Sequence, residues 1–139
     1  MEFRRFKDKY VVRLNKGEEV IASLTKLCDE ENIRLGSISG IGASNKVKMG
    51  LFDIVEKKYY SDTIEKDLEI TSLMGNITRK DEEVYLHLHI NVANREQIVY
   101  GGHLNEAYIS ATCEIIIDVI DGEVDREFSE EIGLNLFKF

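Results

Sequence analysis

The chain has 139 residues, of which 43% are hydrophobic and 32% charged, so we expect one globular domain over residues 1–139. The formal net charge of −8 argues against a surface that binds nucleic acid throughout, because phosphate neutralisation supplies most sequence-independent affinity. No apolar run approaches the roughly 20 residues of a membrane helix, and the first ten residues are too charged for a signal peptide. We therefore expect a cytoplasmic protein without membrane contact.

The first elements are a strand over residues 6–14 and a helix over 16–31. Asn15 is the predicted helix N-cap, with Glu18 three residues later in capping-box position. Apolar residues then recur at helical spacing along one face, at Val20, Ile21, Leu24, Leu27 and Cys28. The basic cluster at Arg4, Arg5, Lys7 and Lys9 indicates a solvated edge strand rather than a nucleic-acid site.

The rest of the chain has the pattern of strands. The extended segments are 33–41, 47–54, 68–77, 83–93, 107–120 and 134–139, with shorter ones at 57–60 and 97–100. Glycines 36, 40 and 42 do not have nucleotide-loop spacing and no helix follows them, so we predict a tight turn or bulge there. One helix and about seven strands predict an α+β domain with a largely antiparallel sheet. Cys28 and Cys113 are expected to be small buried hydrophobes rather than a disulfide.

All three histidines of the chain lie in one short stretch, at His87, His89 and His103. Residues two apart on a strand point to the same face, so the first two imidazoles would lie side by side. A turn near Asn94 would bring His103, which follows two glycines, back beside them. Three imidazoles with one open position are typical of a catalytic-type zinc site, although nickel, iron, cobalt or manganese also fit.

Alternative interpretations remain open for the paired histidines and for Glu114. The face that carries His87 and His89 could be open to water, in which case both are ordinary surface residues. Glu114, flanked by apolar residues, would either support a metal-bound histidine by accepting a hydrogen bond from its ring or be a plain surface or interface charge. No nucleophilic triad, P-loop or HExxH motif is present.

Five segments in this order resemble the plant and prokaryote conserved (PPC) domain, whose members are often labelled predicted DNA-binding proteins. They are residues 36–43 (GSISGIGA), 49–53 (MGLFD), 69–77 (EITSLMGNI), 87–89 (HLH) and 101–104 (GGHL). The resemblance implies a strongly bent antiparallel sheet, a homotrimer, and one metal ion per subunit held by His87, His89 and His103. It also implies a fold like that of acetolactate decarboxylase, a zinc enzyme, which is an analogy of fold alone.

Three functions are compatible with these observations. The first is a three-histidine module, most simply with zinc, that binds a small anionic or carbonyl-containing ligand or assists an unassigned reaction. The second is a DNA-binding or transcription-associated protein. DNA contact in plant members of the family is made by a separate AT-hook, which this chain lacks, having neither proline nor an Arg-Gly-Arg segment. The third is a structural trimerisation module.

Overall fold

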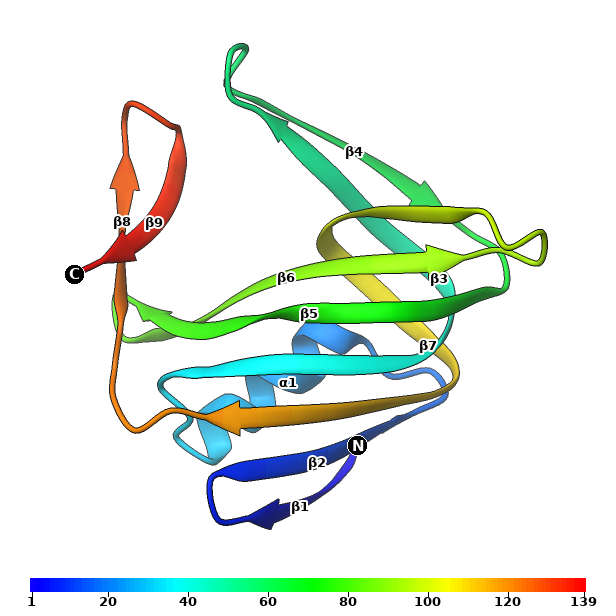
Figure 1. Cartoon of the computed structure of the whole chain (residues 1–139), viewed down its shortest axis with the longest axis horizontal. Helices are drawn as coiled ribbons and strands as arrows, with labels where there is room; N and C mark the ends of the chain where they lie inside the picture. Colours follow the sequence, from blue (N-terminus) through cyan, green and yellow to red (C-terminus); the bar gives the residue numbers. More distant parts are fainter.

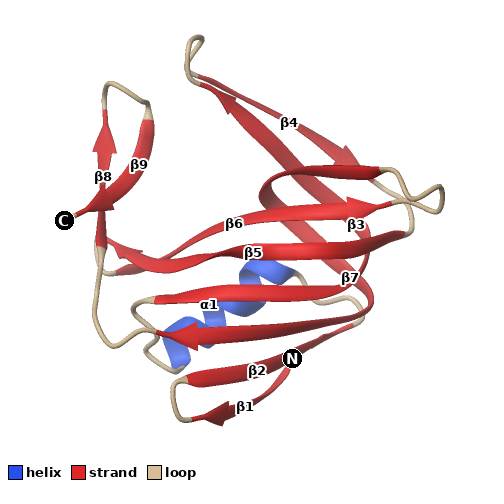
Figure 2. Cartoon of the chain, viewed as in Figure 1, coloured by secondary structure: helices blue, strands red, loops and turns tan.

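The computed structural model describes residues 1–139, and it consists of one helix and nine strands (Figure 1, Figure 2). The elements in chain order are β1 (Glu2–Phe6), β2 (Lys9–Asn15), α1 (Val20–Glu30), β3 (Gly36–Asp53), β4 (Lys58–Ile64), β5 (Leu68–Lys80), β6 (Glu83–Ala93), β7 (Val99–Val119), β8 (Asp125–Ser129) and β9 (Leu134–Lys138). The predicted α+β class is confirmed. No helix has the length and apolar character required to cross a membrane.

Seven strands form one antiparallel sheet in the order β1-β2-β7-β6-β5-β3-β4, and β3 also pairs with β7. The two longest strands, β3 and β7, bend, so that each takes part in two regions of the sheet (Figure 1). Strands β8 and β9 form a separate hairpin. The strand β1, which carries Arg4 and Arg5, is exposed at the sheet edge, as predicted.

Helix α1 covers one face of the sheet (Figure 2). Leu24, Leu27 and Cys28 on its inner side are fully buried and belong to a core of 24 residues that includes Leu88 and Ile90 of β6. Burial raises the pKa of the Cys28 thiol to about 12, and that of Cys113 likewise, which fits their predicted role as small hydrophobes.

The helix begins later than the sequence predicts. It starts at Val20 rather than at residue 16, because Gly17 adopts a positive φ of 88° and Glu19 is the N-cap. The Glu19 carboxylate accepts hydrogen bonds from the backbone N–H of Ala22 at 2.6 Å and of Ala107 at 3.0 Å. Asn15 ends β2 instead, although the Glu18 carboxylate does accept from its backbone N–H at 2.7 Å.

Several predicted segments merge into longer strands. The segments 33–41 and 47–54 fall mostly within β3, and 97–100 and 107–120 fall largely within β7. The glycines at 40 and 42 flank a bulge in the pairing of β3 with β5. The predicted bulge is therefore confirmed, and the alternative of a tight turn is wrong. A Cβ at Gly42 would overlap the backbone of β7 at Thr112, which explains the absence of a side chain there.

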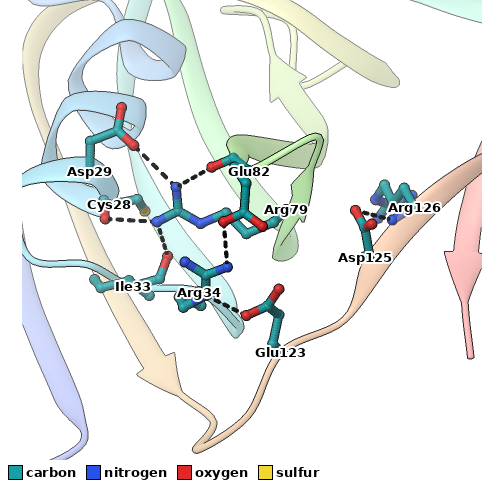
Figure 3. Close-up of polar contacts among 9 residues, drawn as sticks. All are labelled: Cys28, Asp29, Ile33, Arg34, Arg79, Glu82, Glu123, Asp125 and Arg126. Atoms are coloured by element: carbon teal, nitrogen blue, oxygen red, sulfur yellow. Dashed lines mark hydrogen bonds and ion pairs between the residues drawn. The ribbon is translucent and has the colours of Figure 1, made fainter.

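The C-terminal end of α1 is held by a buried arginine, Arg79 of β5 (Figure 3). Its guanidinium donates to the carbonyl oxygens of Cys28 at 3.4 Å and Ile33 at 3.1 Å and forms an ion pair with Asp29 at 3.2 Å. Carbonyl groups at a helix end lack partners within the helix, so this arginine satisfies one of them.

Candidate metal centre

Strand β6 presents two of the histidines on its outer face. The strand has the predicted bounds, Glu83–Ala93, and its inner residues Leu88 and Ile90 are buried beneath α1. His87 and His89 alternate with them and point away from the core, His87 half-buried and His89 exposed.

A tight turn brings the third histidine back to β6. The Asn94 side-chain oxygen accepts hydrogen bonds from the backbone N–H of Glu96 at 3.0 Å and of Ile98 at 2.9 Å. The returning strand β7 then places His103 directly opposite His89. The predicted hairpin is therefore confirmed, and its register aligns two rings across the strand pair.

The glycines before His103 allow a third strand to approach the hairpin. A Cβ at Gly102 would lie 2.8 Å from the carbonyl oxygen of Gly50 in β3, and one at Gly101 would overlap the Asn91 side chain. Gly50 pairs with His103 in the sheet. What approaches these glycines is therefore the backbone of β3 and a side chain of β6, which together fix the backbone just before His103.

The three imidazoles converge on one point. The ring centroid of His87 lies 5.2 Å from that of His89 and 5.2 Å from that of His103. The centroids of His89 and His103 are 5.6 Å apart. One ligand nitrogen from each ring lies within 4.8 Å of the others. A zinc ion held by imidazoles lies about 2.0–2.1 Å from each ligand nitrogen. The donor set and its geometry fit a divalent metal, and the exposure of His89 leaves one side of the cluster open.

The electrostatic environment favours the neutral form of His87 and His103. Burial, and then the neighbouring His103, Arg126 and His89, lower the pKa of His87 to about 4. Burial, and then His89, also lower the pKa of His103. Rings with lowered pKa values are neutral at pH 7, which is the form that binds metals.

Tyr59 and Arg126 lie beside the cluster and were not predicted. The Tyr59 hydroxyl of β4 donates to the Asn105 side chain at 2.6 Å, and its ring meets His103 edge-on at a centroid distance of 6.1 Å. The pKa of Tyr59 is raised, mainly because its side chain is partly buried. Arg126 of β8 donates to Asn76 at 2.7 Å. Both come from elements far from the histidines in the sequence, and no local pattern marks them.

Glu114 lies in another part of the sheet. Its strand positions it opposite Arg13 of β2 and Ile41 of β3, and it lines a groove of about 880 Å³ to which none of the histidines contributes. The structure therefore brings the three histidines together without this carboxylate. A supporting role for Glu114 at the metal stays a prediction.

Solved structures closely match the whole fold. A putative DNA-binding protein from Bacteroides thetaiotaomicron is 33% identical and superposes with a TM-score of 0.97, covering 99% of this chain and 96% of that one. A metal-containing protein from Archaeoglobus fulgidus is 32% identical with a TM-score of 0.90, covering 99% and 97%. A search of curated proteins found no match.

The predicted likeness to acetolactate decarboxylase is confirmed at the level of the fold. The enzyme from Bacillus subtilis is 13% identical with a TM-score of 0.57, and the match spans 84% of this chain but only 54% of the enzyme. The family model of the Plants and Prokaryotes Conserved (PCC) domain matches residues 1–121, including all three histidines. The chain therefore belongs to the Plants and Prokaryotes Conserved domain family, as its motifs predict.

Proposed function

We propose that this chain is a cytoplasmic metal-dependent module that binds a small anionic or carbonyl-containing ligand. His87, His89 and His103 would hold one divalent ion, with zinc the expected metal. The observation that carries the proposal is the convergence of every histidine of the chain on one point that is open on one side. The relative from Archaeoglobus fulgidus, described as metal-containing, supports it.

The residues of this centre would have different roles in binding the metal. The three neutral imidazoles supply the ligands, and the pairing of His103 with Gly50 and His89 fixes where that ring lies. The Tyr59 ring shields His103 from one side. When bound, the ion would supply Lewis-acid character or a lowered pKa of coordinated water.

Metal analysis of protein purified without a histidine tag tests this proposal. We expect about one zinc ion per chain and a saturable zinc titration that His87→Ala and His103→Ala abolish. Asp118→Asn serves as the control, because this exposed acid pairs with Lys9 and lies where β7 pairs with β2 and β3 rather than with β6, so the change should leave binding unchanged. Glu114→Gln tests the supporting carboxylate. A wild-type protein that takes up no metal, or that binds equally well without His87, would remove the proposal.

We also propose that the module is a homotrimer. The support is an apolar groove on the sheet face opposite α1, lined by residues such as Phe6, Ile41 and Met74, of which each is more than half exposed. Exposed apolar patches of this kind mark interaction sites. Met74 lies directly opposite His89 across β5 and β6, so a second copy in the groove would border the metal centre. Light scattering should give three times the chain mass, and Met74→Glu should give the mass of one chain.

DNA binding is the second candidate, because the relative from Bacteroides thetaiotaomicron is described as a putative DNA-binding protein. It predicts a duplex complex that weakens steeply with salt. The net charge of −8 opposes it. A mobility assay at low salt separates the two functions, and the absence of any shift excludes this one. If the chain were only a structural trimerisation module whose histidines satisfy one another, chelation would leave ligand binding and stability unchanged.

A further inference from the structure

Two arginines are buried in this protein, and only one has a counter-charge. Arg79 and Arg126 are 5% and 6% exposed. Arg79 forms an ion pair with Asp29. None of the eleven ion pairs of the chain includes Arg126. The adjacent carboxylate of Asp125 instead accepts from the backbone N–H of Arg126 at 2.8 Å (Figure 3).

The Arg126 guanidinium is held rigidly by neutral partners. Its carbon lies 4.5 Å from the centroid of the Tyr85 ring and 4.7 Å from that of Phe137, so it sits between two aromatic rings. It donates to Thr78 Oγ1 at 2.8 Å, to the Asn135 carbonyl at 3.0 Å and to Asn76 Oδ1 at 2.7 Å. An arginine has five N–H donors, so one on each terminal nitrogen remains for another acceptor.

These contacts place the cation next to the histidine cluster. Asn76 lies directly opposite His87 across β5 and β6, and Thr78 lies opposite Tyr85. Residues opposite each other on antiparallel strands share a face of the sheet. Arg126 therefore lies over the outer face one residue pair from His87. Its charge contributes to the lowered pKa of His87, after burial and His103.

A buried cation without a carboxylate is unusual, because buried charges in proteins are normally paired. The uncompensated positive charge becomes larger when three neutral imidazoles hold a divalent cation close by, since the metal and Arg126 are both positive. An anion at the open position of the metal would compensate both. A neutral ligand would compensate neither.

We propose that Arg126 selects the ligand of this centre by charge, so that the ligand is a small carboxylate. The inference rests on the proposed metal site and names its ligand class. Arg126 acts here as a positioning and specificity residue, contributed by the β8–β9 hairpin beyond the residues 1–121 that the family model matches. The two remaining N–H groups suit the two oxygens of a carboxylate.

The test uses the full-length protein with Co²⁺ in place of zinc, titrated separately with acetate and with imidazole in a non-coordinating buffer. Both ligands change the visible spectrum when they enter the metal's open position, but only acetate is charged. Arg126→Met should weaken acetate binding by about tenfold or more, the expected effect of one unit charge a few ångströms away. It should leave imidazole binding unchanged and metal affinity unchanged or higher.

A second variant keeps the arginine and its packing. Asn76→Asp replaces the side chain that accepts from Arg126 with an isosteric carboxylate, which supplies the missing counter-charge. It should also weaken acetate selectively, even if Arg126→Met does not fold. Arg95→Met is the matched control, because this arginine of the β6–β7 turn has a side chain 91% exposed, and its loss should change neither titration.

The outcomes separate this inference from the proposed function. Variants that hold Co²⁺ and bind acetate as tightly as the wild type overturn the role of Arg126 and leave the metal site standing. Equal losses of acetate and imidazole overturn it too, because the effect would then be structural. A wild-type protein that takes up no metal refutes the proposed function itself.

Discussion

The metal-free protein should lose stability as the pH falls from about 6.5 to about 4, and His87 should be a main cause. The pKa of this ring is about 4 in the folded chain, against an ordinary value of 6.5. Above pH 6.5 the ring is neutral in both states and contributes no pH dependence. Below 6.5 the unfolded chain takes up a proton that the folded chain resists, so the free energy of unfolding falls until the pH reaches about 4.

The size of the effect follows from the difference between the two pKa values. At about 1.36 kcal/mol per pH unit, the full difference corresponds to about 3 kcal/mol. Because His87 is only half-buried, solvent screens part of this, and we expect about 1–2 kcal/mol. His87→Gln removes the titrating group while keeping a polar side chain of similar reach.

Urea unfolding followed by circular dichroism at pH 7, 6, 5 and 4, with a chelator present, measures the effect. The carboxylates titrate in both proteins and cancel in the difference between them. The wild type should lose about 1–2 kcal/mol more than His87→Gln between pH 7 and pH 4. A difference that is constant across this range, or of opposite sign, would refute the reasoning.

Three further predictions concern the scaffold. Gly75→Ala should lower the free energy of unfolding by about 1–3 kcal/mol and reduce zinc binding, because the added methyl group would overlap the carbonyl oxygen of His87; isothermal titration with zinc checks the second effect. Glu19→Ala should cost about 1–2 kcal/mol in urea unfolding, since it removes the helix N-cap. Leu24→Ala should cost about 2–5 kcal/mol at a fully buried position and leave the zinc stoichiometry of the folded protein at one; a loss of stability without any loss of zinc distinguishes it from Gly75→Ala.

Local patterns were sufficient for the hairpin that carries the site. Strand β6 alternates apolar and polar residues over its whole length, and Asn94 marks the turn that follows, so both could be predicted. The approach of the three histidines followed from these two features. The predicted start of α1 was wrong because Glu19 caps the helix in place of Asn15, although asparagine is the more usual N-cap residue. The Glu19 carboxylate also binds the backbone N–H of the distant Ala107, a contact that no local pattern reports.

The surroundings of the site depend on contacts between distant segments. Glycines in β3 and β7 resemble turn residues in the sequence, yet here they allow two long strands to cross at close range. Arg126 belongs to a strand that was not predicted at all, and Asn76, which it contacts, is 50 residues away. Tyr59 is 46 residues from Asn105. No periodicity in one segment reports on such pairs.

The position of β7 in the sheet has a consequence for how the chain folds. This strand pairs with β2, β3 and β6, and its residue Asp118 meets Lys9, 109 residues earlier. Contacts over such separations slow folding, because the entropy cost of closing a long loop comes before the contacts that compensate it. During synthesis, β2 and β3 must therefore wait with unpaired edges until β7 has left the ribosome. The strand that delivers His103 is the same one that completes the sheet, so a functional centre and a closed sheet would arise in the same late step.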